Sequence, residues 1–144
     1  MKQRKIGIAI IAVLIFLTAV LAAIHVNTRD NVPKGTIAVI KDGQTRYIRL
    51  DGLELSNVTG TVVNGKGEEK QIDAQGLPLS SVTGTEGFQN VTVTAMDAYL
   101  AVVSLDELDN AYLIFTGDET PRLIVFGDRN SKRDVKDVER IEIE

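Results

Sequence analysis

The sequence has no cysteine, no tryptophan and only one histidine among its 144 residues. A chain without cysteine forms no disulfide and offers neither a thiolate metal site nor a cysteine nucleophile. A single histidine excludes metal sites that need a histidine pair, and any catalytic triad would have to use His25. These absences exclude several kinds of chemistry, and the length of the chain leaves room for one domain of ordinary size.

Acidic residues are missing from the N-terminal region and are in excess everywhere else. From Val26 onward there are 20 aspartates and glutamates against 13 lysines and arginines, so this part carries a net charge of −7. Nucleic-acid binding needs a basic surface that neutralises phosphates, and an acidic domain argues against it. The same charge argues against electrostatic attachment to anionic lipid.

One long apolar run lies near the N-terminus. Three basic residues, Lys2, Arg4 and Lys5, precede the nineteen uncharged residues of Ile6–Ile24. As a helix this run would be about 28 Å long at about 1.5 Å per residue, which is enough for the hydrocarbon core of a bilayer. We therefore expect residues 1–25 to form a single-pass membrane anchor. The positive-inside rule then predicts a cytoplasmic N-terminus and an extracytoplasmic domain.

Two other interpretations of the apolar run remain open. A cleaved signal peptide would release the domain as a secreted protein, although its apolar region is usually only about 7–15 residues long. Ala19, Ala22 and Ala23 offer a poor cleavage site for it. A helix buried in a soluble domain is the other interpretation. No cysteine follows the run, which excludes a lipoprotein anchor.

Residues 26–35 are polar, contain Pro33 and Gly35, and predict a short linker to a domain over residues 36–144. In that domain short alternating segments are separated by turn residues, which is the pattern of β-strands. Asp42-Gly43 and Asn64-Gly65 each lie between two such segments and predict hairpins with tight turns. The expected strands are Thr36–Ile40, Thr45–Leu50, Val58–Val63, Glu68–Ile72, Val91–Ala95, Tyr99–Val103, Ala111–Phe115, Arg122–Phe126 and Val138–Ile143.

Two short helices are expected among these strands. Leu77–Val82 predicts a helical turn with Pro78 in its first turn. Ser104 followed by Glu107 predicts a capping box that opens a brief helix over Ser104–Leu108. Strands dominate, so the sequence predicts an α+β fold made mainly of antiparallel sheet. Because aromatic side chains supply much of a small core's burial, five of them are expected inside: Phe88, Tyr99, Tyr112, Phe115 and Phe126.

The second half of the chain carries five short motifs in a recognisable order. They are Gly76–Ser80, Val91–Tyr99, Ser104–Leu113, Arg122–Asp128 and Val135–Ile143. In this order they resemble the molybdopterin-binding domain of sulfite-oxidase-type oxidoreductases. The motifs of that domain are, in order, a G-x-P-L turn, a V-x-V-x-x-x-D-G-Y strand and turn, a short helix with the next strand, an R-L-V-x-P-G segment and a closing V-K-x-x-x-x-I-x-V segment. The resemblance covers Leu77–Ile143 firmly and Thr36–Gln75 loosely. It implies the fold of that domain and a pterin cofactor that carries molybdenum.

The chain departs from that family where the metal would bind. The family's molybdenum ligand is a cysteine thiolate in the first half of the domain, and a thiolate is the natural soft ligand for such a metal. The corresponding stretch here, Gly60–Gly67, has no cysteine. Ala98 replaces the family's glycine, and Phe126 replaces its proline. We therefore expect a reduced copy of the fold without catalytic residues or bound metal, and molybdopterin enters as a cofactor only through the resemblance.

Arg122, Arg133 and Lys136 are the candidate cofactor-binding residues. In the resembled family, arginine and lysine near these positions approach the phosphate of the pterin, and a guanidinium matches the geometry of a phosphate. The same basic concentration also contains Arg129, Lys132 and Arg140. Acidic residues are interleaved with these cations, so a solvated face of mixed charge is the competing interpretation.

Other polar residues have plain explanations beside the functional ones. Asp97 would suit a site, but turn formation explains it as well. His25 fits an interfacial position, and Asn57 and Asn90 each begin an N-x-T glycosylation pattern that is common by chance. Five carboxylates would suit a hard cation, but they lack the spacing of a calcium loop, so helix capping and charged turns also explain Asp106, Glu107, Asp109, Asp118 and Glu119.

Two main functional hypotheses follow. The first is a membrane-anchored, non-enzymatic extracytoplasmic module that binds an unknown protein partner or a small anionic ligand. The second is a pterin-binding oxidoreductase component that works with a partner subunit. A purely structural role in the cell envelope is a third interpretation.

Overall fold

The computed structural model describes the backbone of residues 2–27, 32–117 and 120–144. Within these ranges, the surroundings of the side chains are described for residues 6–20, 32–117 and 120–144. The chain divides into two compact units, Met1–Asn31 and Val32–Glu144.

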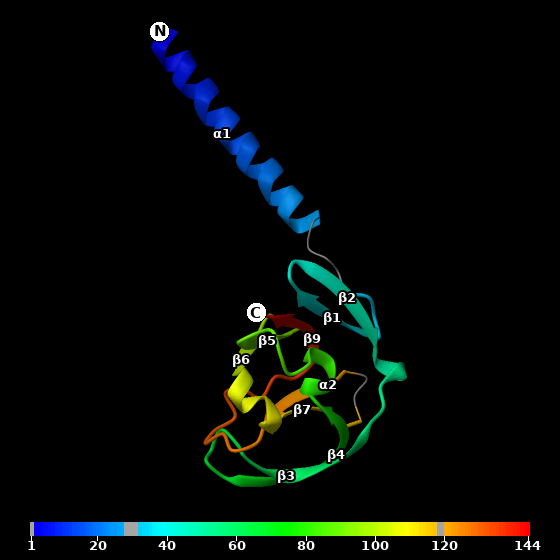
Figure 1. Ribbon diagram of the computed structural model, residues 1–144. Coiled ribbons are helices and arrows are strands. Elements are labelled where there is room, and N and C mark those ends of the chain that lie inside the picture. The colour runs from blue at the N-terminus through cyan, green and yellow to red at the C-terminus, as the bar shows by residue number, and fades with distance from the viewer. Residues whose placement is uncertain (1, 28–31, 118–119) are drawn as a thin grey trace. The chain divides into compact units, whose positions relative to one another are not determined.

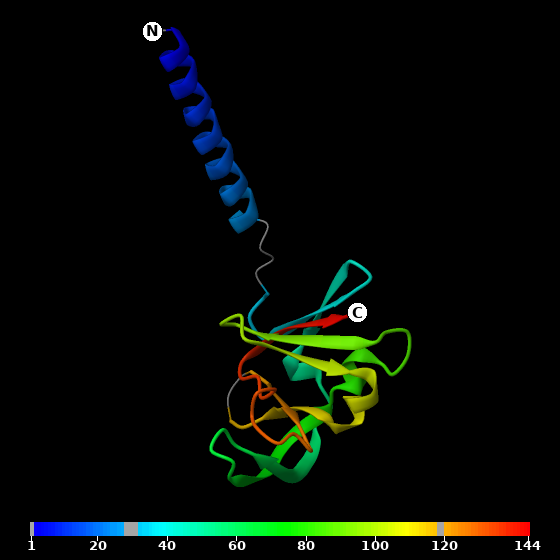
Figure 2. The ribbon, with the colours of Figure 1, turned by 90° about the vertical axis from the view of Figure 1, so that its left-hand side faces the viewer.

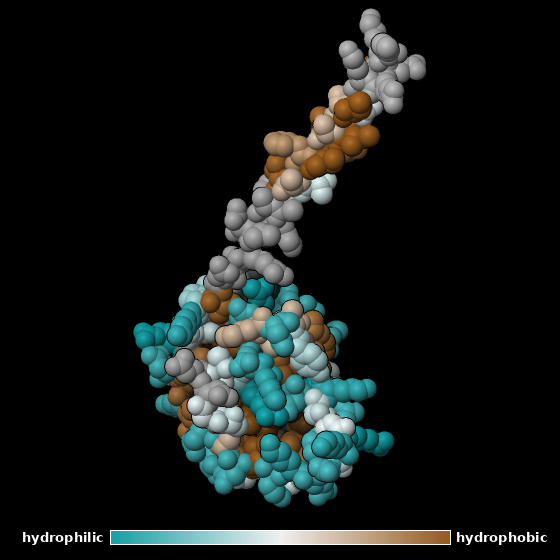
Figure 3. Space-filling model, turned by 180° about the vertical axis from the view of Figure 1, so that it is seen from behind, coloured by the Kyte–Doolittle hydropathy of each residue, from teal (hydrophilic) through white to brown (hydrophobic). Residues whose placement is uncertain are grey.

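The first unit is built on one helix, α1 (Lys2–Asn27), of 26 residues (Figure 1). Its apolar side chains are spread around the helix rather than gathered on one face, and those from Ile6 to Val20 are exposed (Figure 3). Over the part of the chain with described side chains, no helix is both long and apolar enough to cross a membrane. The side chains of residues 21–25, which are the last positions of the predicted segment Ile6–Ile24 and His25, lie outside the described residues.

The second unit contains two β-sheets that lie in two layers (Figure 2). The five-stranded sheet has the order β2-β1-β9-β5-β6 and the four-stranded sheet the order β3-β4-β7-β8. The strands of the first are β1 (Thr36–Lys41), β2 (Gln44–Arg49), β5 (Asn90–Ala95), β6 (Leu100–Ser104) and β9 (Val138–Ile143). Those of the second are β3 (Ser56–Val63), β4 (Glu69–Pro78), β7 (Ala111–Phe115) and β8 (Arg122–Val125).

Helices are few and short in this unit. They are η1 (Leu50–Gly52), α2 (Ser80–Thr83) and η2 (Leu105–Asn110). Every strand pair of the two sheets is antiparallel except β1 with β9, which is parallel. The expected α+β class with mainly antiparallel sheet is therefore confirmed.

The core lies between the two sheets because alternate residues of each strand point inward. Val93 and Ile141 of the five-stranded sheet join Leu113 and Leu123 of the other sheet in one buried cluster. The four-stranded sheet buries residues on its opposite face as well, in a second cluster of Val58, Ile72, Ile114 and Ile124. This sheet is therefore covered on both faces, which fixes the β3–β4 hairpin against β7 and β8.

Two glycines allow this close packing. A Cβ on Gly60 would overlap the ring of Phe126, and a Cβ on Gly76 would overlap the carbonyl oxygen of Leu113. The aromatic ring of Phe126 thus packs directly on a glycine. Phe126 also contacts Tyr112 edge to face, with ring centroids 5.4 Å apart.

The predicted helical turn Leu77–Val82 is wrong in its first half. Strand β4 runs for ten residues and ends at Pro78, because Leu77 and Pro78 pair with β7 opposite Leu113 and Tyr112. The strand expected over Glu68–Ile72 is correspondingly longer, and helix α2 begins only at Ser80.

The two predicted tight turns differ from each other. Asp42 and Gly43 both have positive φ, 53° and 73°, as a type I′ turn requires. Asn64-Gly65 does not form such a turn, because β3 and β4 are joined by the longer loop 64–68, in which Gly67 has a φ of 79°. Asn64 Oδ1 accepts hydrogen bonds from the backbone N–H groups of Lys66 and Glu68, both at 2.9 Å, and so stabilises the loop.

Candidate functional site

A pocket of about 530 Å³ opens where three segments of the domain meet. The segments are the β3–β4 hairpin, the β5–β6 turn, and β8 with the stretch that follows it, and they lie on the same side of the domain (Figure 2). Charged and polar side chains line the pocket together with four aliphatic ones, Val62, Val63, Ile124 and Val125. Its volume lies within the range of about 300–1,000 Å³ that is usual for small-molecule sites.

The structure brings the three candidate residues together in this pocket. Arg122 is the first residue of β8, whereas Arg133 and Lys136 lie in the stretch that leads to β9, and all three line the pocket. The other cations of the same concentration are not part of the lining within the described residues: Arg129, Lys132 and Arg140.

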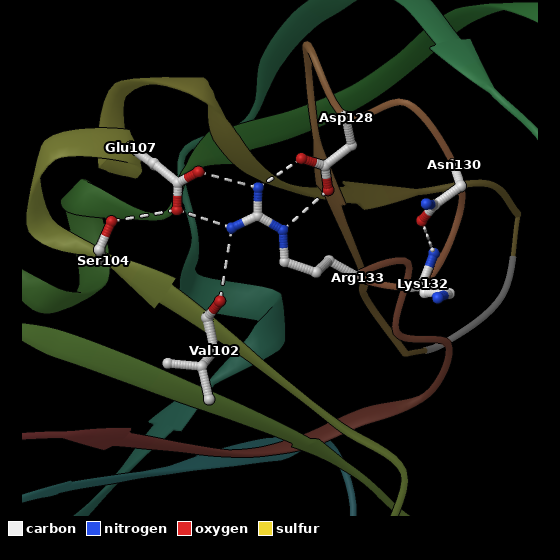
Figure 4. A network of polar contacts seen from close by, with 7 residues as sticks. All are labelled: Val102, Ser104, Glu107, Asp128, Asn130, Lys132 and Arg133. Atoms are coloured by element: carbon white, nitrogen blue, oxygen red, sulfur yellow. Dashed lines mark hydrogen bonds and ion pairs between the residues drawn. The ribbon is translucent and has the colours of Figure 1, made fainter.

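Arg133 is held by two carboxylates at once (Figure 4). Its Nε donates to Asp128 Oδ2 at 2.8 Å, and Nη2 donates to the other oxygen of Asp128. On the opposite side, Nη1 donates to Glu107 Oε2 at 2.7 Å and Nη2 to Glu107 Oε1 at 3.0 Å. A longer contact of 3.4 Å joins Nη1 to the carbonyl oxygen of Val102 in β6. The hydrogen bonds that Arg133 donates to Asp128 and then to Glu107 raise its pKa.

The predicted short helix is present as η2, and Glu107 explains why its capping box forms only in part. Ser104 is the N-cap of η2, but its side chain makes no capping bond to the backbone of the helix. Instead, Ser104 Oγ donates to Glu107 Oε2 at 3.0 Å, and the Glu107 carboxylate turns to Arg133 (Figure 4). The hydrogen bond from Arg133 is the largest cause that lowers the pKa of Glu107, to about 2.

Arg122 forms the second fixed ion pair. Its Nε and Nη2 donate to the two carboxylate oxygens of Asp134, and the two side chains are only 23% and 17% exposed. The hydrogen bond with Asp134 is the largest cause that raises the pKa of Arg122. Next to this pair, Leu123 and Val135 exchange backbone hydrogen bonds of 2.9 and 3.2 Å. Two ion pairs thus fasten the stretch 127–137 to the rest of the domain, Arg133 with Glu107 and Asp134 with Arg122.

Two lysines of the pocket, unlike its arginines, form no ion pairs in the described part of the chain. Lys70 of β4 and Lys136 both line the pocket and are exposed. Within the described part of the chain, neither side chain has a hydrogen-bond or ion-pair partner. Lys70 was not a candidate from the sequence, because nothing in the local pattern of β4 shows that it lies next to a stretch more than fifty residues further on.

Two aspartates of the pocket are held by neutral groups. Asp97 Oδ1 accepts the backbone N–H of Tyr99 at 3.1 Å, which confirms the expected role of Asp97 in the turn. Asp137 Oδ1 accepts the hydroxyl of Thr120 at 2.7 Å. In the described residues, no cation forms an ion pair with either carboxylate.

Tyr99 was expected in the core, and this prediction is wrong. Its side chain is 46% exposed and lines the pocket. The hydroxyl donates to the carbonyl oxygen of Lys132 in the stretch between β8 and β9. Because a phenol needs a polar partner, Tyr99 reaches across to that stretch instead of entering the core. Phe88 is buried as expected, and Tyr112, Phe115 and Phe126 are partly buried.

The acidic set does not form a metal centre in the part of the chain that is described. Asp106, Glu107 and Asp109 lie in η2, whereas Asp118 and Glu119 lie outside the described residues. Among the residues that could be searched, no group of three or more acidic, histidine or cysteine side chains is placed to hold a metal ion.

No model of a known protein family matches this chain, and comparison with curated proteins gives no match either. The resemblance to the sulfite-oxidase-type domain therefore rests on the motifs alone.

Proposed function

We propose that this chain is a membrane-anchored, extracytoplasmic binding module with a trimmed sulfite-oxidase-like fold, and that it binds small anionic molecules rather than catalysing a reaction by itself. The observation that carries the proposal is the pocket itself. It unites the three basic residues to which the resemblance points and adds Lys70.

The anchor is supported by the character of the first unit. Helix α1 has apolar side chains on all sides, and a helix of this kind belongs in a protein core or a bilayer. The basic residues Lys2, Arg4 and Lys5 at its start favour a cytoplasmic N-terminus. The domain would then lie on the other side of the membrane.

The role of each cation in binding follows from its present partners. The guanidinium groups of Arg122 and Arg133 already donate their forks to Asp134, Asp128 and Glu107. A further anion would have to compete with these carboxylates. Lys70 and Lys136 keep all three ammonium donors for a ligand, because no residue of the described chain bonds them. We therefore assign direct contact to the lysines and a positioning role to the arginines.

The donor set of the pocket does not fit a molybdenum cofactor. The stretch Gly60–Gly67, which the resemblance matches to the family's thiolate ligand, contains Asn64 of the pocket lining and no cysteine. The guanidiniums that would approach the pterin phosphate are engaged by carboxylates. We derive no catalytic step through such a group.

Phosphate binding provides the direct test. The full-length chain in detergent micelles would be titrated with inorganic phosphate and followed by ¹⁵N NMR. We expect shifts at residues that line the pocket, and at least a tenfold weaker affinity in the double variant Lys70→Met/Lys136→Met. The matched control is Lys66→Met/Lys132→Met, which removes two exposed lysines outside the lining. Equal affinities in the two double variants would refute the proposal.

The second candidate is a pterin-binding oxidoreductase component that works with a partner subunit. It is favoured by one observation, the convergence of Arg122, Arg133 and Lys136 on one pocket. The test is metal and pterin analysis of the chain after production in a host that makes molybdopterin. A stoichiometric pterin would favour this candidate over the first, whereas its absence together with phosphate binding would favour the binding module.

A further inference from the structure

The charges that line the pocket are balanced, and half of them neutralise each other. Four cations and four carboxylates belong to the lining. Arg122 is paired with Asp134, and Arg133 with Asp128. Outside these two pairs the pocket presents Lys70, Lys136, Asp97 and Asp137, which form no ion pairs with one another in the described structure. Two positive and two negative groups therefore remain for a ligand.

The two aspartates belong to one end of the pocket. The backbone N–H of Met96 donates to the carbonyl oxygen of Asp137 at 3.0 Å, so the turn that carries Asp97 lies beside Asp137. Both carboxylates are held in place, Asp97 by the backbone of Tyr99 and Asp137 by the hydroxyl of Thr120. These bonds leave oxygen lone pairs on each carboxylate that can accept from an ammonium group.

Lys70 comes from a different sheet and a different end of the pocket. It is on β4, paired with Val62 near the tip of the hairpin. Figure 2 shows the hairpin tip and the β5–β6 turn with the stretch between β8 and β9 lying between them. Apolar side chains of Val62, Ile124 and Val125 line the pocket as well, and they suit a short hydrocarbon chain.

A ligand with a single charge would meet groups of its own sign in this pocket. A simple anion would be attracted by the lysines and repelled by Asp97 and Asp137, and a simple cation would meet the reverse. Complementary charges on both partners are what gives such a site specificity. A molecule with one charge of each sign, separated by a short apolar chain, matches all three features of the lining.

We propose that the pocket recognises a small zwitterion, with its anionic group at Lys70 and its ammonium group at Asp97 and Asp137. The inference rests on the proposed function, since it concerns the same pocket, and it names the class of ligand. The anionic part uses the contact already assigned to Lys70, and the two aspartates add the selection for an amine.

The test compares three ligands of equal chain length that differ only at their ends. They are 6-aminohexanoate, hexanoate and hexylamine, titrated into the full-length chain in detergent micelles and followed by ¹⁵N NMR. We expect 6-aminohexanoate to bind at least tenfold more tightly than either of the others. Glycine, β-alanine and 4-aminobutyrate would then show which separation of the charges fits best.

A double variant tests which residues of the pocket bind the ammonium end of the ligand. Asp97→Asn/Asp137→Asn is expected to weaken 6-aminohexanoate binding at least tenfold, to the level of hexanoate, while hexanoate binding stays equal or improves. Asn keeps the acceptor for Tyr99 and Thr120 and tolerates the positive φ of 54° at Asp137. Asp73→Asn, an exposed position outside the lining, is the matched control.

The outcomes separate the two proposals. If hexanoate binds as tightly as 6-aminohexanoate, the zwitterion inference is wrong and anion binding stands. If the amine alone binds best, both proposals are wrong, and the same holds if neither phosphate nor any of the three ligands shifts the pocket residues. The comparison of ligands on the unmodified chain decides the inference even where a variant does not fold.

Discussion

The pocket has two halves, and each contains both cations and carboxylates. In one half these charges form ion pairs with each other, and in the other half they do not within the described structure. The ion-paired half consists of Arg122 with Asp134 and Arg133 with Asp128, and Glu107 pairs with Arg133 from outside the lining. The open half consists of Lys70, Lys136, Asp97 and Asp137, which are all exposed. In the first half the arginine side chains are only 23% and 24% exposed, and each guanidinium meets a carboxylate with two parallel bonds.

The difference follows from the chemistry of the two cations. Arginine presents a planar fork that matches a carboxylate, so it is suited to a fixed pair inside a fold. Lysine carries a compact charge on a flexible stem and stays well hydrated at a surface. A basic cluster in a sequence can therefore contain both structural and binding residues. Substitution of the structural residues should lower the free energy of unfolding, and substitution of the binding residues should lower the affinity for the ligand.

The largest expected effect is that of Arg133→Ala. This change leaves the carboxylates of Asp128 and Glu107 without their common partner in a partly buried place, which we expect to lower the free energy of unfolding by about 3 kcal/mol. The measurement is urea unfolding of the full-length chain followed by circular dichroism. Arg129→Ala, at an exposed position of the same stretch, should change stability by less than about 0.5 kcal/mol. Equal losses of stability in the two variants would contradict the view that the ion-paired half has a structural role.

The next effect in size is that of Arg122→Ala. One carboxylate, Asp134, loses its partner, so we expect a loss of about 2 kcal/mol in the same unfolding measurement. Arg122→Lys sharpens the comparison, because it keeps the charge and removes the fork. Recovery of less than half of the loss would show that geometry, and not charge alone, fixes this residue. Full recovery by lysine would contradict that view.

A smaller effect should appear in acid. The pKa of Glu107 is lowered from 4.5 to about 2, so the stability that its charged form contributes is fully present above about pH 4.5 and is lost as the pH falls through about 2. Because its side chain is 42% exposed, solvent screening limits this contribution to about 1 kcal/mol. The unfolding free energies of the unmodified chain and of Glu107→Gln should therefore differ at pH 6 and converge towards pH 2. A difference that is independent of pH would show that the carboxylate does not act through its charge.

The smallest effect on stability belongs to the open half. Lys136→Met should change the free energy of unfolding by less than about 0.5 kcal/mol, because an exposed side chain without a partner in the described structure is removed. The same variant should bind phosphate several-fold more weakly in the NMR titration. A stability loss as large as that of Arg122→Ala would place Lys136 in the ion-paired half instead.

Strand positions could be predicted because they depend on local alternation. In β5 every second residue is apolar and buried, and in β9 the buried Ile141 and Ile143 alternate with glutamates, so both patterns are visible without knowledge of the fold. The turn at Asp42-Gly43 is equally local, since its backbone needs two residues that accept positive φ. The candidates Arg122, Arg133 and Lys136 came from the resemblance, and the structure places them around one pocket.

The wrong predictions concern residues whose secondary structure or contacts depend on residues far away in the sequence. Pro78 is in a strand because β7 pairs with it, although its local sequence favours the start of a helix. Ser104 has the spacing of a capping box, but Glu107 binds Arg133, which lies in another loop. Tyr99 leaves the core for the carbonyl oxygen of Lys132. Lys70 and the charge balance of the pocket could not be foreseen, because they require the hairpin to lie beside the stretch after β8.

The position of β9 has a consequence for the order in which the domain forms. It lies between β1 and β5 in the five-stranded sheet, next to the earliest strand of the domain. Ile141 from this strand is fully buried between the layers. During synthesis from the N-terminal end, β1 and β5 emerge long before the strand that joins them. The five-stranded sheet therefore cannot form strand by strand as the chain is made. A chain interrupted before Val138 would leave the edges of β1 and β5 open to pairing with other chains.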